Sequence, residues 1–303
     1  MIHHNGDFYP DVFLAGAPKS GTTFLFNRLA AHSVICASNP KETDYFLDPN
    51  NPNKKSDRTL AKNPYPDHYD SLADGLVHLD GSVWTIYQTE LAGKMKTLGR
   101  KPKILFILRE PARRILSSFQ YTSNNLSAVK NLSFSQYVEC LMSSEIDIIE
   151  KACKSKTAAF SLQNELSYSK YSIYLDKWRE AVGVENMKIF LFEDLKADPD
   201  LCYKQVCDFL GLETEELEVD FDEKNQSVVI KNRFVHYFLH RAFSLVGFKV
   251  PFKQQLKRIY SRLQHTEAAK VNYDKDLSKL KAYYRPFNEK LSTDYQLDLK
   301  AWK

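Results

Sequence analysis

Short apolar runs alternate with helical patterns along most of the chain. The apolar runs have the length of strands and fall at 12–15, 34–37, 76–79, 104–108 and 187–192. In "KILFIL" and "MKIFLF" the apolar residues are consecutive rather than alternating, which is typical of parallel strands covered on both faces. Helical patterns follow most of these runs, at 20–32, 86–98, 111–123, 134–151, 164–182 and 200–211. This order of elements predicts an α/β fold with one doubly wound parallel sheet.

The C-terminal part of the chain has a different pattern. After residue 230 the pattern is wholly helical, with helices expected at 233–246, 253–264 and 275–297. We expect 228–303 to form a helical extension that packs on the same domain, so that residues 1–303 make a single domain. The stretch 48–67 is rich in Pro, Asn and Lys, which predicts a long surface loop.

Composition and cysteine usage limit the class of protein. A chain of 303 residues with 43% hydrophobic and 26% charged residues is typical of a globular protein with a substantial core. The five cysteines are scattered and contain no CxxC, which favours reduced thiols over a disulfide framework or a zinc site. No apolar run approaches the ~18 residues that cross a bilayer, and residues 1–10 do not resemble a secretion signal. We therefore expect a cytoplasmic protein.

Positive charge is concentrated near the C-terminus. The net charge of the chain is only +4, but 228–266 contains eight Lys and Arg residues and no Asp or Glu. One interpretation is a pair of helices whose basic side faces solvent. The other is a surface for a polyanionic acceptor or for an anionic membrane that carries a lipid-linked acceptor. We do not expect nucleic-acid binding, because no recognised nucleic-acid motif accompanies the charge.

A glycine-bearing turn follows the first predicted strand. It reads "GAPKSGTT" over 16–23 and leads directly into a predicted helix. Such a turn presents backbone N–H groups and the positive end of the helix to an anion, which is the chemistry of phosphate binding. Gly16 and Gly21 have the spacing of a P-loop, but Thr22 stands where the P-loop has its lysine, and Lys19 lies inside the turn instead. Taken alone, the stretch could also be a tight strand-to-helix turn with a solvated lysine.

A second motif follows the predicted strand 104–108. The stretch "REPARRILSSF" contains Arg109, Pro111, Arg114 and Ser117. Taken alone, it is typical of a helix that begins at a proline and has one basic face. Together the two motifs resemble the 5′-phosphosulfate turn and the R-x-P-x-x-R-x-x-S motif of sulfotransferases that use 3′-phosphoadenosine 5′-phosphosulfate (PAPS). Both would lie at the carboxyl ends of strands, where α/β sheets bind ligands.

The resemblance extends from about residue 11 to residue 291. "NPKETDYF" is similar to the K-E-x-x-x-F segment of the glycan-modifying branch, and "YSKYSIYLDKW", "IFLFEDLKADP" and "YYRPFNEKL" are similar to later family segments. The chain departs from the family in having Asp44 in place of a frequent histidine and Ser169 in place of a frequent glycine. The usual glycine-arginine nucleotide loop is absent between 221 and 234, and "NQSVVIKNR" is the candidate replacement.

The resemblance implies a role for each candidate residue. Lys19 would neutralise the charge that develops on the bridging oxygen of PAPS, and Arg109 and Ser117 would bind the 3′-phosphate. Arg114 either assists that phosphate or pairs with the region of Glu193 and Asp194. The remaining candidates for donor binding are the turn residues Ser20, Gly21, Thr22 and Thr23 and the basic residues Lys231 and Arg233. Because a sulfuryl group carries less charge than a phosphoryl group, we expect no metal requirement.

The resemblance implies that Glu42 is the catalytic base. Taken alone, Lys41 and Glu42 would be a solvated pair at a strand end. If Glu42 is not the base, His78 and Asp80 are the next candidates, since the strand 76–79 is expected to end beside the same crevice. Trp84 and Tyr87 are expected in the core, or flanking an acceptor.

The sequence therefore predicts a PAPS-dependent sulfotransferase that acts on a hydroxyl, as of a carbohydrate or glycolipid. The alternatives are a sulfotransferase for a lipid or small-molecule alcohol, a P-loop kinase for a small metabolite, and a nucleotide-binding module without turnover. The displaced lysine disfavours the kinase.

Overall fold

The centre of the protein is a parallel β-sheet whose strands are not in sequence order. The structure is a computed structural model and describes residues 1–4, 6–54, 64–125, 128–216 and 272–302. Within these residues the sheet has five strands in the order β4-β5-β3-β6-β7, and all neighbours are parallel. The strands are β3 (Val12–Gly16), β4 (Ile35–Ala37), β5 (Val77–Asp80), β6 (Lys103–Leu108) and β7 (Met187–Leu191). The predicted strands and the α/β fold class are confirmed.

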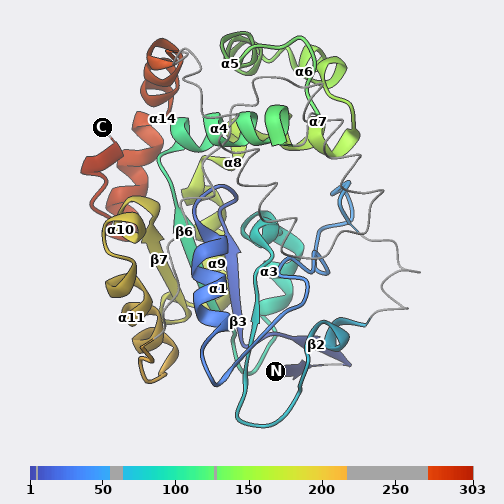
Figure 1. Ribbon diagram of the computed structural model, residues 1–303, viewed down its shortest axis with the longest axis vertical. Coiled ribbons are helices and arrows are strands. Elements are labelled where there is room, and N and C mark those ends of the chain that lie inside the picture. Colours follow the sequence, from blue (N-terminus) through green and yellow to red (C-terminus); the bar gives the residue numbers. More distant parts are fainter. Residues whose placement is uncertain (5, 55–63, 126–127, 217–271, 303) are drawn as a thin grey trace, which may run out of the picture.

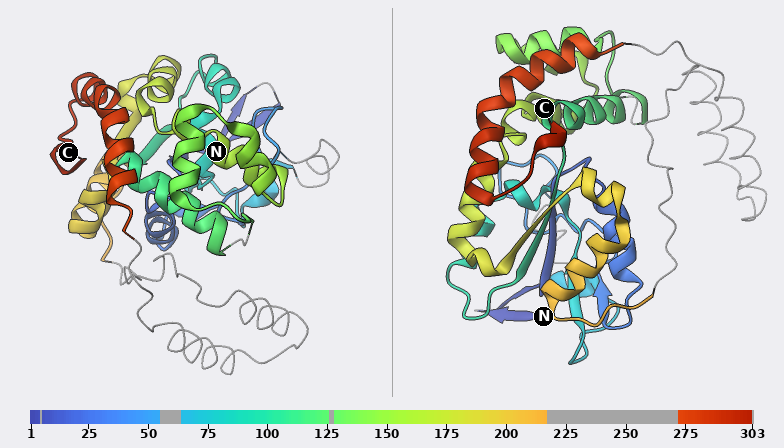
Figure 2. Two further views of the ribbon diagram at one scale, coloured as in Figure 1. Left: turned by 90° about the horizontal axis from the view of Figure 1, so that it is seen from above. Right: turned by 90° about the vertical axis from the view of Figure 1, so that its left-hand side faces the viewer.

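Helices cover both faces of this sheet (Figures 1 and 2). Along β6, Ile104, Phe106 and Leu108 belong to the core on one face. The alternate residues Leu105 and Ile107 belong to the core on the other face. Because successive side chains of a strand point to opposite faces, an uninterrupted apolar run is what a doubly covered strand requires.

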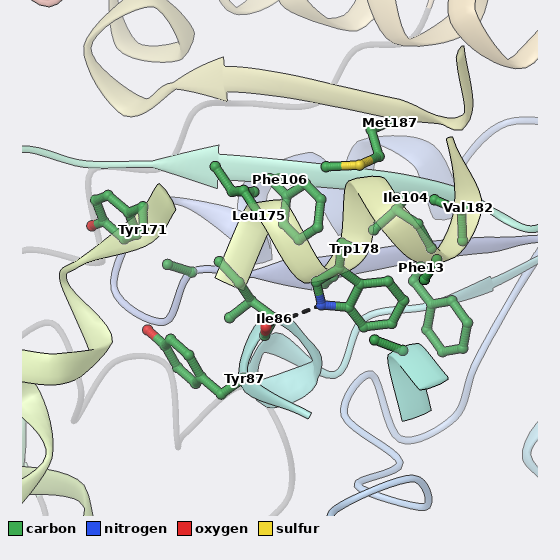
Figure 3. Close-up of a cluster of buried hydrophobic side chains, with 14 of the residues drawn as sticks. Phe13, Ile86, Tyr87, Ile104, Phe106, Tyr171, Leu175, Trp178, Val182 and Met187 are labelled. Carbon is green, nitrogen blue, oxygen red and sulfur yellow. Dashed lines mark hydrogen bonds between the residues drawn. The ribbon is translucent and has the colours of Figure 1, made fainter. Parts of the chain in front are cut away.

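One face packs on α3 (Thr89–Met95) and α9 (Tyr171–Val182), and the other on α1 (Thr22–Ala30) and α11 (Pro199–Leu210). Trp178 of α9 fills the first core and donates its Nε1–H to the carbonyl of Ile86 at 3.0 Å (Figure 3). Ile86 lies in the 3₁₀ helix η2 (Val83–Tyr87), which follows β5. This bond satisfies a polar group in the middle of an apolar cluster.

A third group of helices lies beyond the end of the sheet at which β6 runs into α4 (Figure 1). These helices are α4 (Pro111–Gln120), α5 (Phe134–Ser143), α6 (Ile146–Ala152), α7 (Lys156–Gln163) and α14 (Asp274–Tyr295). They share a core that includes Tyr137, Leu280 and Tyr284. The parallel strands end at this edge of the sheet, and the turns that carry the predicted site residues follow the strand ends. These helices therefore lie next to the predicted site residues.

Other elements complete the described chain. They are the hairpin β1 (Ile2–His4) and β2 (Asp7–Tyr9), α8 (Glu165–Tyr168), α10 (Phe192–Ala197), the 3₁₀ helices η1 (Tyr65–His68), η4 (Val184–Asn186) and η6 (Lys300–Trp302), and the π-helix η3 (Tyr121–Asn125). Among the described residues, no helix has both the length and the apolarity to span a membrane.

Several predicted helices differ from the observed ones. The expected helix 134–151 is broken between α5 and α6, where Ser144 has a left-handed φ of 62°. The expected helix 164–182 is split into α8 and α9. The expected helix 86–98 begins within the 3₁₀ helix η2 and continues as α3. The expected helix 275–297 is confirmed as α14. The expected helices 233–246 and 253–264 lie outside the described residues, and the single domain over 1–303 stays a prediction.

Candidate active site

The turn between β3 and α1 has a backbone that few residue types can adopt. Gly16 has a φ of 144°, and a Cβ atom there would lie 2.6 Å from the carbonyl oxygen of Val83. Lys19 and Gly21 also have positive φ values, of 68° and 84°. The turn ends at Gly21, whose carbonyl accepts from the N–H of Phe24 at 3.1 Å. The N–H groups of the first helical turn have no partners within a helix, so those of Thr22 and Thr23 remain available to an anion.

Arg109 lies against this turn. Strands β3 and β6 are neighbours, and Gly16 is in register with Phe106. Arg109 follows β6 and donates from Nη1 to the carbonyl oxygen of Lys19 at 3.0 Å. The Arg109 guanidinium also lies 4.6 Å from the centre of the Phe192 ring. The sheet therefore brings the two predicted motifs together at one edge.

Two buried polar atoms at this place have no hydrogen-bond partner among the residues that the structure describes. They are Arg109 Nε and Ser20 Oγ, and Ser20 is fully buried. A buried donor without an acceptor costs about 1–3 kcal/mol, and more when it is charged. Oxyanions bound at the turn and at Arg109 would satisfy both donors.

The Lys19 ammonium is partly removed from solvent. Its Nζ lies 3.8 Å from the centre of the ring of Tyr121, an exposed residue directly after α4. Burial, followed by the positive charge of Arg109, lowers the pKa of Lys19 to about 8, against the opposing effect of Glu42 and Glu165. Lys19 is therefore mostly protonated at neutral pH and loses its proton as the pH rises through about 8.

Ser117 lies one helical turn before Tyr121, whose N–H donates to the carbonyl of Ser117. This places Ser117 on α4 near the residue that covers Lys19. Tyr121 was not identified from the sequence, although its spacing of four from Ser117 on a predicted helix is a usable signal, because residues four apart share a helix face. Lys231 and Arg233 lie outside the described residues.

Glu42 lies in the segment that follows β4. Its carboxylate Oε1 accepts from Lys41 Nζ at 2.9 Å, and Lys41 Nζ also donates to the carbonyl of Gly81 at 3.0 Å. The side chain of Glu42 is 38% exposed, whereas that of Lys41 is 17% exposed. Lys41 and Glu42 thus form the ion pair that the sequence alone suggested. The pair is anchored to the end of β5, and the charge of Glu42 acts on Lys19.

The two alternative bases are unsuitable. His78 is buried near the start of β5, where its Nδ1 lies 3.1 Å from the carboxylate of Asp11 and its Nε2 lies 3.0 Å from the carbonyl of Ser71. The expectation that His78 lies at the crevice is wrong, because it occupies the opposite end of the strand. Asp80 does lie at the carboxyl end of β5, but it is fully buried and its two carboxylate oxygens accept from three donors.

Arg114 has a different partner from those expected. It is 1% exposed and forms a buried ion pair with Glu165, and its Nε donates to Ser169 Oγ at 3.1 Å. The expected pairing with Glu193 and Asp194 is wrong. Glu165 also accepts from Ser118 at 2.5 Å, so this ion pair fixes α4 to α8 behind the turn.

The two aromatic candidates, Tyr87 and Trp84, differ in how deeply they are buried. Tyr87 is buried, and its ring stacks on that of Tyr168 with ring centres 4.1 Å apart. Trp84 is partly buried and packs against both rings. Tyr87 is therefore a core residue, while Trp84 retains an accessible part.

Comparison with known proteins identifies the family. The model of the sulfotransferase domain matches residues 9–234. The chain belongs to the sulfotransferase family. Sulfotransferases of this family take the sulfuryl group from PAPS, and the protein is accordingly a PAPS-dependent sulfotransferase.

Individual sulfotransferases match at low identity. Sulfotransferase 2A1 of Rattus norvegicus is 24% identical over 232 residues, which cover 76% of this chain and 70% of the rat protein. Bifunctional heparan sulfate N-deacetylase/N-sulfotransferase 1 of Caenorhabditis briggsae is 24% identical over 209 residues, covering 67% of this chain but 23% of that protein. The crystal structure of a sulfotransferase from Alicyclobacillus acidocaldarius superposes with a TM-score of 0.62 at 18% identity, covering 97% of this chain and 99% of that one. The last comparison confirms the fold.

The ion pair behind the turn gives a prediction about stability. In Glu165→Gln the carboxylate is replaced by a neutral amide, which leaves Arg114 buried without its opposite charge. Breaking such a pair costs about 3–5 kcal/mol, so we expect the free energy of unfolding, measured by urea denaturation, to fall by that amount. Glu180→Gln is the matched control, since Glu180 is 70% exposed in its pair with Lys96 and should change stability little. Equal effects of the two substitutions would contradict this account of Arg114.

Proposed function

We propose that this sulfotransferase transfers the sulfuryl group of PAPS to a hydroxyl of a carbohydrate or glycolipid, with Lys19 and Glu42 as its catalytic residues. The observation that carries the proposal is the contact between Arg109 Nη1 and the Lys19 carbonyl. It supports a single nucleotide site with Lys19 and the turn at the sulfuryl end and Arg109 with Ser117 at the 3′-phosphate. The unpartnered Arg109 Nε and Ser20 Oγ fit the oxyanions of such a donor.

The turn and Lys19 would stabilise the leaving group. As the acceptor oxygen bonds to sulfur, the bond from sulfur to the bridging oxygen breaks and negative charge develops on the departing 3′,5′-diphosphoadenosine. The Lys19 ammonium would neutralise this charge at the bridging oxygen. The 5′-phosphate would accept from the Ser20, Gly21, Thr22 and Thr23 N–H groups and from nearby hydroxyls. Lys231 and Arg233 are further proposed contacts for the nucleotide.

Glu42 would accept the proton that the acceptor hydroxyl loses. Its carboxylate accepts a hydrogen bond from Lys41 and is partly exposed, so it is accessible to an acceptor. The proposed acceptor class rests on the similarity of the Lys41–Glu42 segment to the glycan-modifying branch. It is also supported by the half-buried Trp84, because a flat aromatic face suits a sugar ring. A lipid or small-molecule alcohol is the alternative acceptor, and we propose a cytoplasmic location.

The first test uses the pKa of Lys19. Protonated Lys19 binds phosphate, so the affinity for 3′,5′-diphosphoadenosine should be highest below pH 8 and should fall as pH rises through about 8. With a second pKa of about 6, the phosphates are almost fully ionised above about pH 7.5, so the profile from pH 7.5 to 9.5 is not affected by their titration. Isothermal titration calorimetry measures the dissociation constant across this range.

Lys19→Met should weaken binding at pH 7 by roughly 10- to 100-fold, the equivalent of about 1.5–3 kcal/mol for a charged hydrogen bond. Its affinity should then change much less with pH than that of the wild type. Parallel pH profiles for the two proteins would exclude Lys19 as the titrating group.

The second test concerns the donor and the metal. We expect 3′,5′-diphosphoadenosine to raise the melting temperature in the presence of EDTA, and Mg·ATP to have little effect, because the turn and Arg109 supply the positive charge. A kinase would give the reverse result. Arg109→Gln should reduce the shift, while Arg179→Gln, which removes an exposed guanidinium on α9, should leave it unchanged.

The third test identifies the acceptor and the base. Labelled PAPS is supplied with a panel of oligosaccharides, glycolipids, sterols and simple alcohols, and transfer is measured for the wild type and Glu42→Gln. We expect transfer to a sugar hydroxyl and a loss of about 100-fold or more in Glu42→Gln, within the range of general base catalysis, without loss of nucleotide binding. Near-normal turnover in Glu42→Gln would remove Glu42 from the mechanism.

A further inference from the structure

The segment that carries Glu42 is bonded to the end of β5 on both sides of the glutamate. On one side, Gly81 N–H donates to the carbonyl of Lys41 at 3.1 Å, and Lys41 Nζ returns a bond to the Gly81 carbonyl. On the other side, Thr43 Oγ1 donates to Asp80 Oδ2 at 2.8 Å. Glu42 is therefore held between two attachment points on neighbouring residues of one strand end.

Asp80 is the centre of the second attachment. Its Oδ2 also accepts from the hydroxyl of Tyr65 at 3.0 Å, and its Oδ1 accepts from the N–H of Ser82 at 2.7 Å. Asp80 and Thr43 are both fully buried. A buried carboxylate is expensive to keep unless donors surround it, and here three neutral donors do so. An amide of the same shape has only one acceptor atom and would leave donors unsatisfied.

Ser82 extends the attachment to the residue after Thr43. Its Oγ accepts from the N–H of Asp44 at 3.1 Å. Asp44 has a positive φ of 52°, a conformation that is uncommon for residues other than glycine. Thr43 Oγ1 in addition accepts from the N–H of Tyr45 at 3.3 Å. The bonds from Asp80 and Ser82 thus fix the sharp turn by which the chain leaves Glu42.

Gly81 allows the first attachment to form. A Cβ atom at this position would lie 2.8 Å from Lys41 Cγ and 2.5 Å from the ring of Phe26. Without a side chain at position 81, the Lys41 chain lies close over the end of the strand and reaches the Gly81 carbonyl. This contact in turn holds the ammonium that pairs with Glu42.

We propose that Asp80 is a positioning residue for Glu42, acting through Thr43 and the 43–45 turn. The inference rests on the proposed role of Glu42 as the base. Within the described residues, Asp80 forms no hydrogen bond with the 16–23 turn or with Arg109. We therefore expect Asp80 to affect the reaction of the acceptor and not the binding of the nucleotide. A shift of about 1 Å in a catalytic group can cost about 100-fold in rate, which sets the scale of the expected effect.

The test combines Asp80→Asn with Glu42→Gln in a double-mutant cycle. Transfer is measured to the best acceptor of the panel and, independently, as release of sulfate from PAPS to water. Asp80→Asn should lower kcat about 10- to 100-fold and leave the dissociation constant of 3′,5′-diphosphoadenosine within about twofold of the wild type. In the Glu42→Gln background, Asp80→Asn should cause no further loss, because the group that it positions is absent. Hydrogen exchange should increase over 41–45 and stay unchanged over 16–25.

Two controls separate positioning from a general loss of stability. Asp11→Asn disturbs another buried carboxylate, which accepts from the His78 N–H at the far end of β5, and should not lower kcat in the folded protein. Thr43→Val removes the hydroxyl that contacts Asp80 and should reproduce the loss, whereas Thr43→Ser keeps the hydroxyl and should restore most of the rate. If Asp80→Asn does not fold, the Thr43 pair carries the test.

The outcomes distinguish this inference from the proposed function. Wild-type transfer by both Asp80→Asn and Thr43→Val, with transfer lost in Glu42→Gln, would overturn the role of Asp80 alone. An equal loss from Asp80→Asn in the wild-type and Glu42→Gln backgrounds would also overturn it. Near-normal transfer by Glu42→Gln would overturn the base assignment and this inference together.

Discussion

The hydrogen bond from Arg109 Nη1 to the Lys19 carbonyl is the contact on which the rest of the site depends. It forms because β3 and β6 are neighbours although some ninety residues separate their ends in sequence, so two turns with unrelated local patterns meet at one edge of the sheet. A guanidinium keeps its proton throughout the physiological pH range, so the contact fixes both the shape of the turn and a permanent positive charge beside Lys19.

That arrangement is costly in the absence of an anion. Two partly buried cations repel each other, and burial together with this repulsion lowers the pKa of Lys19. Arg114, five residues after Arg109 in α4, shows the contrasting solution: it is buried more deeply, but Glu165 neutralises it. Within the part of the chain that the structure describes, Lys19 and Arg109 form no ion pair at the carboxyl edge of β3 and β6, whereas Arg114 is paired with Glu165. The difference between the two arginines is what the proposed anion site at this edge requires.

The sequence predicts those parts of the protein that depend on local pattern. The five strands are short, mainly apolar runs. Lys19 and Arg109 could be located because the turn with Lys19 follows one such run and Arg109 follows another. The partner of Arg114 could not be predicted, because Glu165 lies 51 residues away in a stretch without a motif. Asp80 had the right place for a base, at a strand end, and only its burial among Thr43, Tyr65 and Ser82 reveals that no acceptor can reach it. Similarly, the break at Ser144 depends on one left-handed residue within an otherwise continuous helical pattern.

The order of the strands also explains how the two halves of the site are coupled. One half, formed by the turn with Lys19 and by Arg109, lies on β3 and β6. The other half, the segment with Glu42, is held by β5, on the other side of β3. The two halves meet at Gly16, because a Cβ atom at this position would lie 2.6 Å from the carbonyl oxygen of Val83. Val83 directly follows Ser82, whose hydroxyl fixes the turn after Glu42. A side chain at position 16 would therefore displace the donor turn and the end of β5 together. The absence of a Cβ atom at position 16 thus sets the separation between the turn that carries Lys19 and the segment that carries Glu42.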